Sequence, residues 1–515
     1  MKKHLRYAGL ASVAFLAASC GNTQLGMVSG EQIMKDVRSG LGNEVNLQEP
    51  VSSALTLEES IARALKYNLK QRLGSLNEAL SQNKYKVAQA AMLPSVVASM
   101  DYKNRDKYDV SDAKNLETGA ITSGTTISRS RDSVGSGLTA SWNILDFGLS
   151  YVRAKQAADR VMIAAERRRK VTHELVNEVQ SSYWRAFAAQ ELEDRVKKTQ
   201  AQVSESKRNL EAVLANKLDK PIDVLRDLRE ILSLELQLKN ISRELVENKT
   251  RLASLMGMLP NARYALAPSD SQLAKIVVDY KQLENYALQN RTELREDEYN
   301  IRISRNEVTA AMLGMLPGVN LSVGVNNTTD SLVANQSWID GSLSVGWNLM
   351  NLVTGVRQAD LAKVQLDVAK ARKLVVGSAV LMSVRLSWLD YWESLKSYRA
   401  VAELQDVEDQ LIEKIRAQAR SNNISPVDEI RADISNLVNV LRHSFAFADV
   451  KNAQNRLLLS IAYDPASVID VDADLEEVTA EVKAVMGDWQ NRVNNLGKAV
   501  ATETTVYKAA APTLS

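Results

Sequence analysis

The chain is poor in the residues that most enzymes and metal sites need. Its 515 residues include one cysteine and 3 histidines. A disulfide framework, a cluster of metal ligands and a Cys–His or Ser–His catalytic pair are therefore disfavoured as classes of site. We expect no enzyme activity, no metal and no cofactor.

Proline and aromatic residues are scarce as well. There are 9 prolines and 5% aromatic residues, against 45% hydrophobic and 24% charged residues. This balance suits long helices better than compact globular domains. Neither sign of charge is in large excess, because the chain has 64 Lys and Arg residues and 62 Asp and Glu residues, for a net charge of +2. A nucleic-acid-binding surface that covers the protein is therefore disfavoured.

The N-terminus reads as an export signal. Lys2, Lys3 and Arg6 precede an apolar run at 7–18. That run is too short to span a bilayer, and its basic flank is typical of a secretory signal peptide. We therefore expect residues 1–19 to be removed.

The only cysteine stands directly after this segment. Cys20 follows Leu-Ala-Ala-Ser and precedes Gly-Asn. This arrangement resembles a bacterial lipobox, whose cysteine becomes a diacylated N-terminus, and the lack of a following aspartate implies sorting to the outer membrane. The alternative is a thiol beside an ordinary cleavage site. We expect a lipidated segment over 20–55, and one lipid chain anchors a protein only marginally.

The sequence contains an internal repeat, and such a repeat affects the interpretation of the whole fold. Residues 83–94 match 306–317 at an offset of 223, and further matches follow at an offset of 205. The 18-residue difference must lie before Trp142, in a loop that varies between the copies. The matches at 205 are Trp142 with Trp347, Pro221 with Pro426, and Asp223 with Asp428. We therefore expect structural repeats at 56–260 and 283–465.

Most of each copy shows a sequence pattern typical of helices. Apolar residues recur at helical spacing over 57–92, which predicts one helix that ends before Pro94. The stretches 149–216 and 356–420 are almost free of proline and glycine, which predicts helices about 100 Å long. Each long helix is followed by a short polar turn, a proline and a returning helix. The two turns, at 216–221 and 421–426, are therefore predicted to be the tips of helical hairpins.

Between the predicted helices, apolar residues recur at every second position. Over 319–325 and 343–349 apolar residues alternate with Ser, Asn and Gly, and 96–102 and 138–144 show a similar pattern. Such strands, apolar on one face and small and polar on the other, are typical of a membrane β-barrel. We expect β-hairpins at 95–145 and 318–350; a hairpin packed on its own protein is the alternative.

Four strands from one chain cannot close a membrane barrel. Eight is the usual minimum, and open strand edges in lipid leave backbone groups unsatisfied. Several chains must therefore share one barrel. Trp142 and Trp347 stand at matching strand ends, where an aromatic belt at the membrane interface would place them.

Together these features resemble the outer-membrane efflux protein (TolC-like) family. The features are LTLEESIARAL at 55–65, the Leu-Pro strand entries, WNxxDFG at 142–148, the Pro-x-Asp tips and the duplicated unit. The resemblance covers residues 50–465. It implies a mainly helical homotrimer whose long hairpins form an α-barrel in the periplasm, continued by a shared 12-stranded barrel in the outer membrane.

The resemblance also implies a function. The chain would be the outer-membrane channel of a tripartite efflux or secretion system, giving passive export of drugs, metals or proteins. Its partners would be a periplasmic adaptor protein, an inner-membrane pump or ATP-binding transporter, and outer-membrane lipid. The other reading left open is a lipid-anchored coiled-coil structural or adaptor lipoprotein of the envelope without a pore.

The helical tips are the expected place of gating. By resemblance, Asp428 lies on a ring of aspartates at the pore constriction, with Asp223 as its counterpart, and Arg431 stands where a second carboxylate is expected. Three Asp428 carboxylates around a pore would favour cations. Both aspartates also follow a proline at a helix start, where a carboxylate complements the helix dipole.

The polar turns carry further candidates. By resemblance, the tips meet an adaptor end to end, through Leu218 and Asp219 in the first tip and Ile424 and Ser425 in the second. A local contact that fixes the turn is the alternative for the two apolar residues.

Two segments lie outside the repeats. By resemblance, the insert at 261–282 and the tail at 466–515 form a belt around the middle of the tunnel. The tail is rich in acidic residues, and we expect disorder beyond Gly497. We interpret the mid-helix aromatic pairs as packing between helices: Tyr183 with Phe187, and Trp388 with Trp392.

Overall fold

The protein divides into two units, which are described separately: Met1–Pro50 and Val51–Ser515. The computed structural model describes residues 28–108, 113–122, 127, 129–216, 221–268, 273, 276, 278–421, 426–462 and 469–494. The predicted signal peptide and Cys20 lie outside the described residues, as does the stretch beyond Gly497.

The first unit contains a helix that the sequence analysis did not predict. Helix α2 (Gly30–Asn46) begins after Ser29, whose hydroxyl accepts a hydrogen bond of 3.1 Å from the backbone N–H of Gln32. This is an ordinary N-cap. No residue of α2 is buried.

In the second unit, the predicted single helix over 57–92 is wrong, because Asn68 interrupts it. Asn68 has an extended backbone (φ −72°, ψ 126°), and its side chain accepts a hydrogen bond from the Lys70 N–H at 2.9 Å. Its Nδ2 also donates to the Leu255 carbonyl at 2.9 Å. Asn68 thus ends α3 (Leu57–Tyr67) and caps α4 (Leu69–Ala90).

The second copy has the same break at the same offset. Arg291 (φ −58°, ψ 126°) separates α7 (Tyr280–Asn290) from α8 (Thr292–Leu313), and its Nη1 donates to the Leu459 carbonyl at 2.8 Å. In both copies, the residue at the break therefore reaches a carbonyl near the end of the returning helix.

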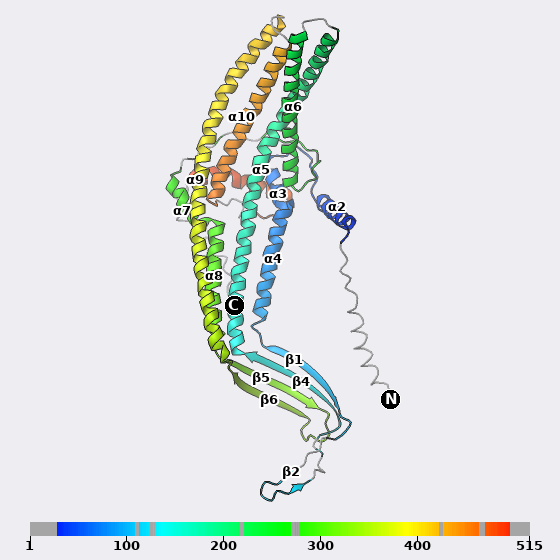
Figure 1. The fold of residues 1–515 in the computed structure, drawn as a ribbon, viewed down its shortest axis with the longest axis vertical. Helices are drawn as coiled ribbons and strands as arrows, with labels where there is room; N and C mark the ends of the chain where they lie inside the picture. Colours follow the sequence, from blue (N-terminus) through cyan, green and yellow to red (C-terminus); the bar gives the residue numbers. More distant parts are fainter. Residues whose placement is uncertain are drawn as a thin grey trace. The chain divides into compact units, whose positions relative to one another are not determined.

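The predicted long helices are present and slightly longer than expected. Helices α5 (Ile144–Ala215) and α9 (Met350–Arg420) have 72 and 71 residues, or about 107 Å each. The returning helices α6 (Pro221–Leu255) and α10 (Pro426–Ser460) have 35 residues each and start with the expected prolines. Figure 1 shows each long helix beside its returning helix.

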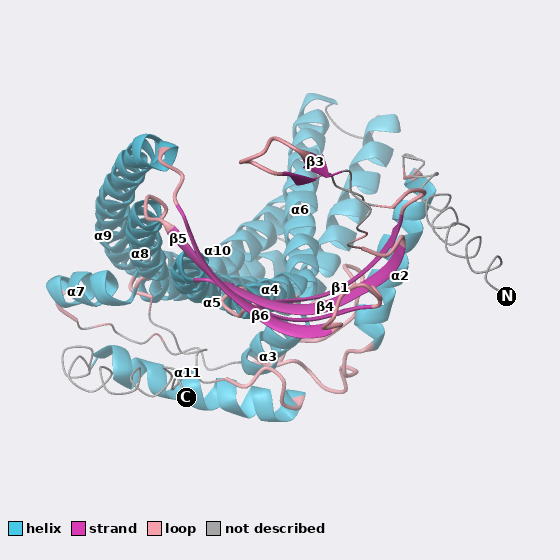
Figure 2. Ribbon diagram, turned by 90° about the horizontal axis from the view of Figure 1, so that it is seen from below, coloured by secondary structure: helices cyan, strands magenta, loops and turns pink. Residues whose placement is uncertain are grey.

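One sheet contains the strands of both copies. Its order is β1-β4-β5-β6, and all neighbours are antiparallel. Figure 2 shows this sheet as a single curved layer. A separate pair, β2 (Ala113–Lys114) and β3 (Ile121–Thr122), lies within the longer loop of the first copy. The four main strands are β1 (Ser95–Asn104), β4 (Asp132–Asn143), β5 (Gly318–Thr328) and β6 (Ser337–Gly346).

The strand pairs β1–β4 and β5–β6 form the hairpins that alternation predicts. The last strand differs in position from its prediction, because β6 starts at Ser337 and ends at Gly346. Trp347 and Leu349 therefore follow the strand, although their alternation continues the strand pattern. The predicted class, mainly helical with short strands, is confirmed.

Four helices form the wall next to the sheet, in the order α4, α5, α8, α9. Small residues lie on their contact stripes, since Ala154, Ala157, Ala359 and Ala362 are all buried. Polar side chains link neighbouring helices as well. Arg168 on α5 pairs with Glu78 on α4 at 2.6 Å.

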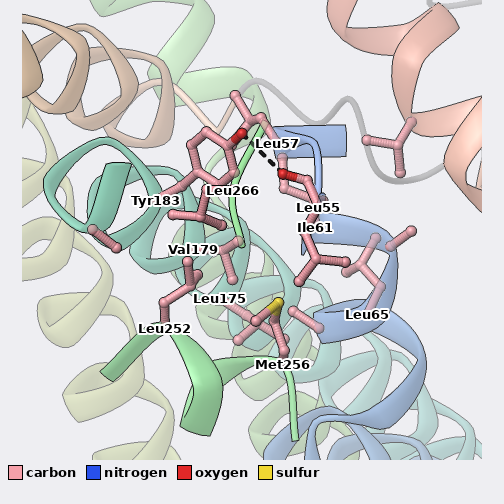
Figure 3. Packing of buried hydrophobic residues seen from close by; sticks show 14 of the residues in the cluster. Leu55, Leu57, Ile61, Leu65, Leu175, Val179, Tyr183, Leu252, Met256 and Leu266 are labelled. Atoms are coloured by element: carbon pink, nitrogen blue, oxygen red, sulfur yellow. Dashed lines mark hydrogen bonds between the residues drawn. The ribbon is translucent and has the colours of Figure 1, made fainter. Parts of the chain in front are cut away.

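The largest apolar cluster lies where α3, α5 and the end of α6 meet. Tyr183 of α5 is fully buried there, and its hydroxyl donates to the carbonyls of Leu55 (3.2 Å) and Ala267 (2.6 Å). Leu55 in turn forms a parallel bridge with Leu266 of the insert. Figure 3 shows these side chains around Ile61. Mid-helix aromatic packing is confirmed here.

The second copy has an equivalent cluster. Tyr391 is buried in it and accepts a hydrogen bond of 3.2 Å from the Ile276 N–H of the insert, while Trp388 and Trp392 pack edge to face at 5.7 Å. The insert therefore contributes to the clusters of both copies.

The tail contributes a helix to the first cluster. Helix α11 (Leu475–Asn494) lies against α3, and Leu475, Val478 and Val482 are buried in the Tyr183 cluster. This part of the tail is therefore a packed element of the fold.

Candidate functional site: the sheet and the helical tips

The register of the four strands sorts the side chains into two faces. Across β1, β4, β5 and β6, Ala98 is level with Leu138, Val325 and Ile339. Because side chains alternate along a strand, the neighbouring row points the other way. The row three positions from Ala98 points the same way as that neighbouring row, and it contains Ser95, Ser141, Ser322 and Ser342. The sheet thus has one apolar face and one small polar face.

The apolar face is exposed to whatever surrounds the single chain. Val96, Met100, Val323, Val325 and Leu343 are all at least half exposed. A soluble chain does not leave such a contiguous patch uncovered. The strand lengths of 10 to 12 residues are close to the 9–11 residues of a tilted membrane strand.

Both predicted interface tryptophans lie at the junction of sheet and helices, in different settings. Trp142 is the penultimate residue of β4, on the apolar face, and packs edge to face on Phe147 at 5.3 Å. Trp347 follows β6, and its Nε1 donates to the Met315 carbonyl at 3.0 Å. Trp142 is 38% exposed and Trp347 51% exposed, so an amphipathic indole is accessible at each position.

The second predicted site is the pair of helical tips. Residues 217–220 and 422–425 lie outside the described residues. The adaptor-contact candidates Leu218, Asp219, Ile424 and Ser425 are among them. What the structure places are the helical turns that flank the tips.

Each returning helix begins with the same pattern, Pro-x-Asp-x-x-Arg. In α6, Asp223 pairs with Arg226 at 3.2 Å, and in α10, Asp428 pairs with Arg431 at 2.5 Å. An acid in the first turn complements the helix dipole, and a base three residues later lies on the same face. Neither aspartate is therefore an isolated negative charge.

Among the described residues, Arg431 makes a contact that has no counterpart at Arg226. Its Nε and Nη2 both donate to the carboxylate of Glu230 on α6, while its Nη1 donates to Asp428. The guanidinium thus joins the returning helices of the two hairpins, with the planar two-point geometry that suits arginine. Hydrogen bonding from Arg431 lowers the pKa of Glu230, and the same bond raises the pKa of Arg431.

An apolar layer fixes the backbone beneath this ion-pair network. Val224 of α6 is buried, and Val427, Ile430 and Ile434 of α10 pack in one cluster with Ile231. On the next turn of α10, Asp433 pairs with Arg416 of α9 at 2.8 Å. The position of Arg431 is therefore fixed by packing on both sides.

The sequence analysis singled out Asp223, Asp428 and Arg431 and missed Arg226 and Glu230. Arg226 could have been found, because it matches Arg431 at the same offset of 205 that pairs the aspartates. Glu230 has no such signal: its match at that offset is Ser435, and it meets Arg431 only because α6 and α10 lie side by side.

The family comparison agrees with this geometry. A family model described as "Outer membrane efflux protein" matches residues 61–258, which is the first repeat. The resemblance to that family is confirmed. No curated relative matches the chain by sequence.

Solved structures of outer-membrane channels share the fold across both repeats. CmeC of Campylobacter jejuni aligns with a TM-score of 0.63 at 12% identity, over 84% of this chain and 94% of CmeC. The open state of MtrE of Neisseria gonorrhoeae aligns with a TM-score of 0.58 at 16% identity, over 78% of this chain and 89% of MtrE. The outer-membrane channel OprN aligns with a TM-score of 0.60 at 16% identity, over 79% of this chain and 89% of OprN. At these identities, the comparison shows the TolC-like fold alone.

Proposed function

We propose that three copies of the chain form a channel through the bacterial outer membrane, which lets substrates leave the cell envelope passively. The apolar face of the sheet contacts lipid in this assembly, and the small polar face lines a water-filled lumen. The observation that carries the proposal is the exposed apolar face of a four-stranded sheet that cannot close on itself.

The edges of the sheet support a shared barrel. Strands β1 and β6 are its two edge strands, and each carries unpaired backbone groups along its outer side. Such groups cost several kcal/mol each in hydrocarbon, so a membrane sheet must close. Pairing of β1 with β6 of a second copy satisfies both edges, and three copies supply the 12 strands that the family resemblance implies.

The edges of the helical wall support the same assembly. On α4, an apolar stripe is exposed at Leu69, Leu73, Leu76, Leu80 and Val87. The spacing of four and three residues is that of a coiled-coil seam. On α9, at the other edge of the wall, a similar stripe is exposed at Leu361, Val364, Val368, Val375, Met382, Leu386 and Leu389.

These stripes fit each other in a closed ring. When β1 of one copy meets β6 of the next, α4 of the first copy comes to lie next to α9 of the second. Contact between two different edges repeats in a head-to-tail ring, which closes if the rotation is right. The α4 and α9 stripes then become buried seams between copies.

Helix α9 is also apolar enough to cross a membrane by length and composition, over a window that is 17% buried. We assign that window to the seam with α4, because it belongs to a 71-residue helix that packs along α8 and α10. A helix in that position is part of a protein wall.

The remaining parts of the proposal follow the family resemblance. Cys20 is the site of lipidation, the helical tunnel lies in the periplasm, and the tips with Leu218, Asp219, Ile424 and Ser425 meet a periplasmic adaptor. An inner-membrane pump or ATP-binding transporter supplies the substrate. The chain performs no catalytic step, since an open conduit needs none.

Planar-bilayer recording of the purified protein tests the proposal. A channel gives discrete conductance steps, and its trimers in outer-membrane fractions resist trypsin and shift in electrophoretic mobility on heating. A chain that mild detergent extracts as a monomer without conductance would instead be the lipid-anchored coiled-coil lipoprotein.

A further inference from the structure

The small polar face of the sheet is interrupted by one large aromatic side chain. Trp338 of β6 is level with Asn326, Gly137 and Ser99. Every other residue in that row is small or polar. The Trp338 side chain is 42% exposed and makes no hydrogen bond or ring contact with other described residues. Its indole is thus an exposed apolar surface on the face that we assign to the lumen.

Two carboxylates stand on the same face. Asp340 is two residues from Trp338, about 7 Å along β6, and Asp101 lies on β1. Asp101 has a cationic partner, because Lys103 reaches it at 3.2 Å. For Asp340, the described partner is the neutral Asn326, whose Nδ2 donates to Oδ1 at 2.9 Å.

Glycines on the neighbouring strands make room for these carboxylates. A Cβ atom at Gly324 would lie 2.6 Å from Oδ1 of Asp340, and one at Gly135 would lie 2.4 Å from Oδ1 of Asp101. Neither contact is possible for a real side chain. The carboxylate of Asp340 therefore lies over the bare backbone of β5, held by Asn326.

The charges on this face do not cancel. Its charged residues within the strands are Asp101, Asp340 and Lys103, so each copy contributes one net negative charge, and Asp340 is the uncompensated group. Asp428 at the tips differs from Asp340 in having a cationic partner, Arg431. The sheet thus holds a carboxylate without a described cationic partner and an exposed indole two residues apart on one strand.

We infer that Trp338 and Asp340 of three copies form a ring inside the barrel that binds organic cations with apolar surface. The inference rests on the proposed channel and names the class of substrate that its lumen favours. The indole face attracts a cation through its quadrupole and contacts apolar groups, while the carboxylate supplies the opposite charge.

The chemistry of the ring argues against other ligands. Each copy offers one carboxylate and no imidazole or thiolate at this level, which is a poor set for a transition metal. Anions are repelled by the net charge, and small hydrated cations gain nothing from the indole. The contacts are few and open to water, so binding stays weak enough for a cation to leave outward.

Block of the channel by tetraphenylphosphonium tests the inference. The trimer is placed in a planar bilayer in potassium chloride, and the tetraphenylphosphonium concentration that halves the potassium current is measured. We expect block of the native channel. Trp338→Ala and Asp340→Asn should each raise the half-blocking concentration at least about fivefold, because three equivalent contacts are lost at once.

Matched variants separate the ring from general effects. Trp338→Phe keeps an aromatic face and should stay within about threefold of the native value. Trp347→Ala changes a tryptophan outside the polar face, and the double variant Asp101→Asn, Lys103→Gln removes an ion pair that carries no net charge. Both should leave the half-blocking concentration nearly unchanged. The potassium current of each variant shows that it has folded and assembled.

Two results would overturn the inference while leaving the channel intact. One is a conducting native channel that tetraphenylphosphonium does not block, and the other is equal block of the native, Trp338→Ala and Asp340→Asn channels. A native protein without any potassium current would instead contradict the proposed function on which the inference rests.

Discussion

Arg431 of α10 holds the carboxylate of Glu230 of α6 in a two-point contact, so one guanidinium ties together the returning helices of two hairpins. The same guanidinium also donates to the carboxylate of Asp428. Any movement that separates the two returning helices at the tips must break these contacts. The aspartates alone are therefore an incomplete description of the tips.

The family resemblance implies a pore constriction at the tips, and removal of the guanidinium there should make the channel more selective for cations. In Arg431→Gln, the Asp428 and Glu230 carboxylates are left unpaired in each copy. We expect the potassium-over-chloride permeability ratio, measured from reversal potentials, to rise at least about twofold. Arg226→Gln is the matched control, because Arg226 pairs with one carboxylate, that of Asp223, among the described residues. It should change the ratio less.

Asp428→Asn tests whether the Asp428 carboxylate contributes to the cation preference. In the native background it should lower the cation preference, and in the Arg431→Gln background it should lower it more, because Asp428 is then unpaired. Reversal potentials that do not respond to Asp428 in either background would remove this residue from the filter.

Loss of the Tyr183 hydroxyl should destabilise the cluster that joins α3, α5 and the insert. Tyr183→Phe leaves the carbonyls of the buried Leu55 and the half-buried Ala267 without this donor. The expected cost is about 1–3 kcal/mol. Differential scanning calorimetry should show a lower melting temperature than in Tyr85→Phe, a control that removes a half-buried hydroxyl of α4. Equal melting temperatures would contradict the account of this cluster.

A charge in the α4 stripe should block assembly. In Leu76→Glu, the carboxylate would have to be buried without a partner against α9 of the next copy, which is costly. Light scattering of the protein in detergent should show a loss of trimers. Leu116→Glu is the control, because Leu116 is 96% exposed in the β2–β3 loop, away from the stripe. If Leu76→Glu still forms trimers, this stripe is not a seam.

Acid should weaken the α5–α6 hairpin over a defined range of pH. Hydrogen bonds from Lys197 and then from Lys249 lower the pKa of Glu193 from 4.5 to about 2. Because the folded pKa is depressed, the contribution of Glu193 to stability is complete above pH 4.5 and is lost as the pH falls towards 2.

Hydrogen exchange of the hairpin measures this contribution. The difference in protection between the native protein and Glu193→Gln should be largest above pH 4.5 and vanish near pH 2. The side chain is 43% exposed, so solvent screening keeps the difference small. A difference that does not change with pH would contradict the assignment.

The duplication made much of the fold predictable from the sequence. Repeated motifs placed the long helices, the returning helices and the two β-hairpins, since helical and strand periods are local properties of the chain. The break at Asn68 was missed because its apolar spacing continues across the gap, and the capping hydrogen bond to Lys70 competes locally with the helix.

Contacts between distant segments were not predictable. Glu230 and Arg431 are 201 residues apart in sequence, and Trp338 lies before the stretch where alternation was recognised in β6. Strand register decides that Trp338 stands level with Asn326 and Gly137, and helix packing decides that Arg431 reaches α6. Neither is encoded in a local pattern.

Cysteine cross-linking between copies tests the shared barrel most directly. Val97→Cys on β1 is expressed in one tagged copy, and Asp340→Cys, Ser342→Cys or Ser344→Cys on β6 in a copy with another tag. Within one chain, β4 and β5 separate these strands by about 14 Å, too far for a disulfide. The account predicts a disulfide between differently tagged chains for at least one β6 position. If none of the three positions forms a disulfide in the assembled protein, the sheets do not join edge to edge and the barrel is not shared.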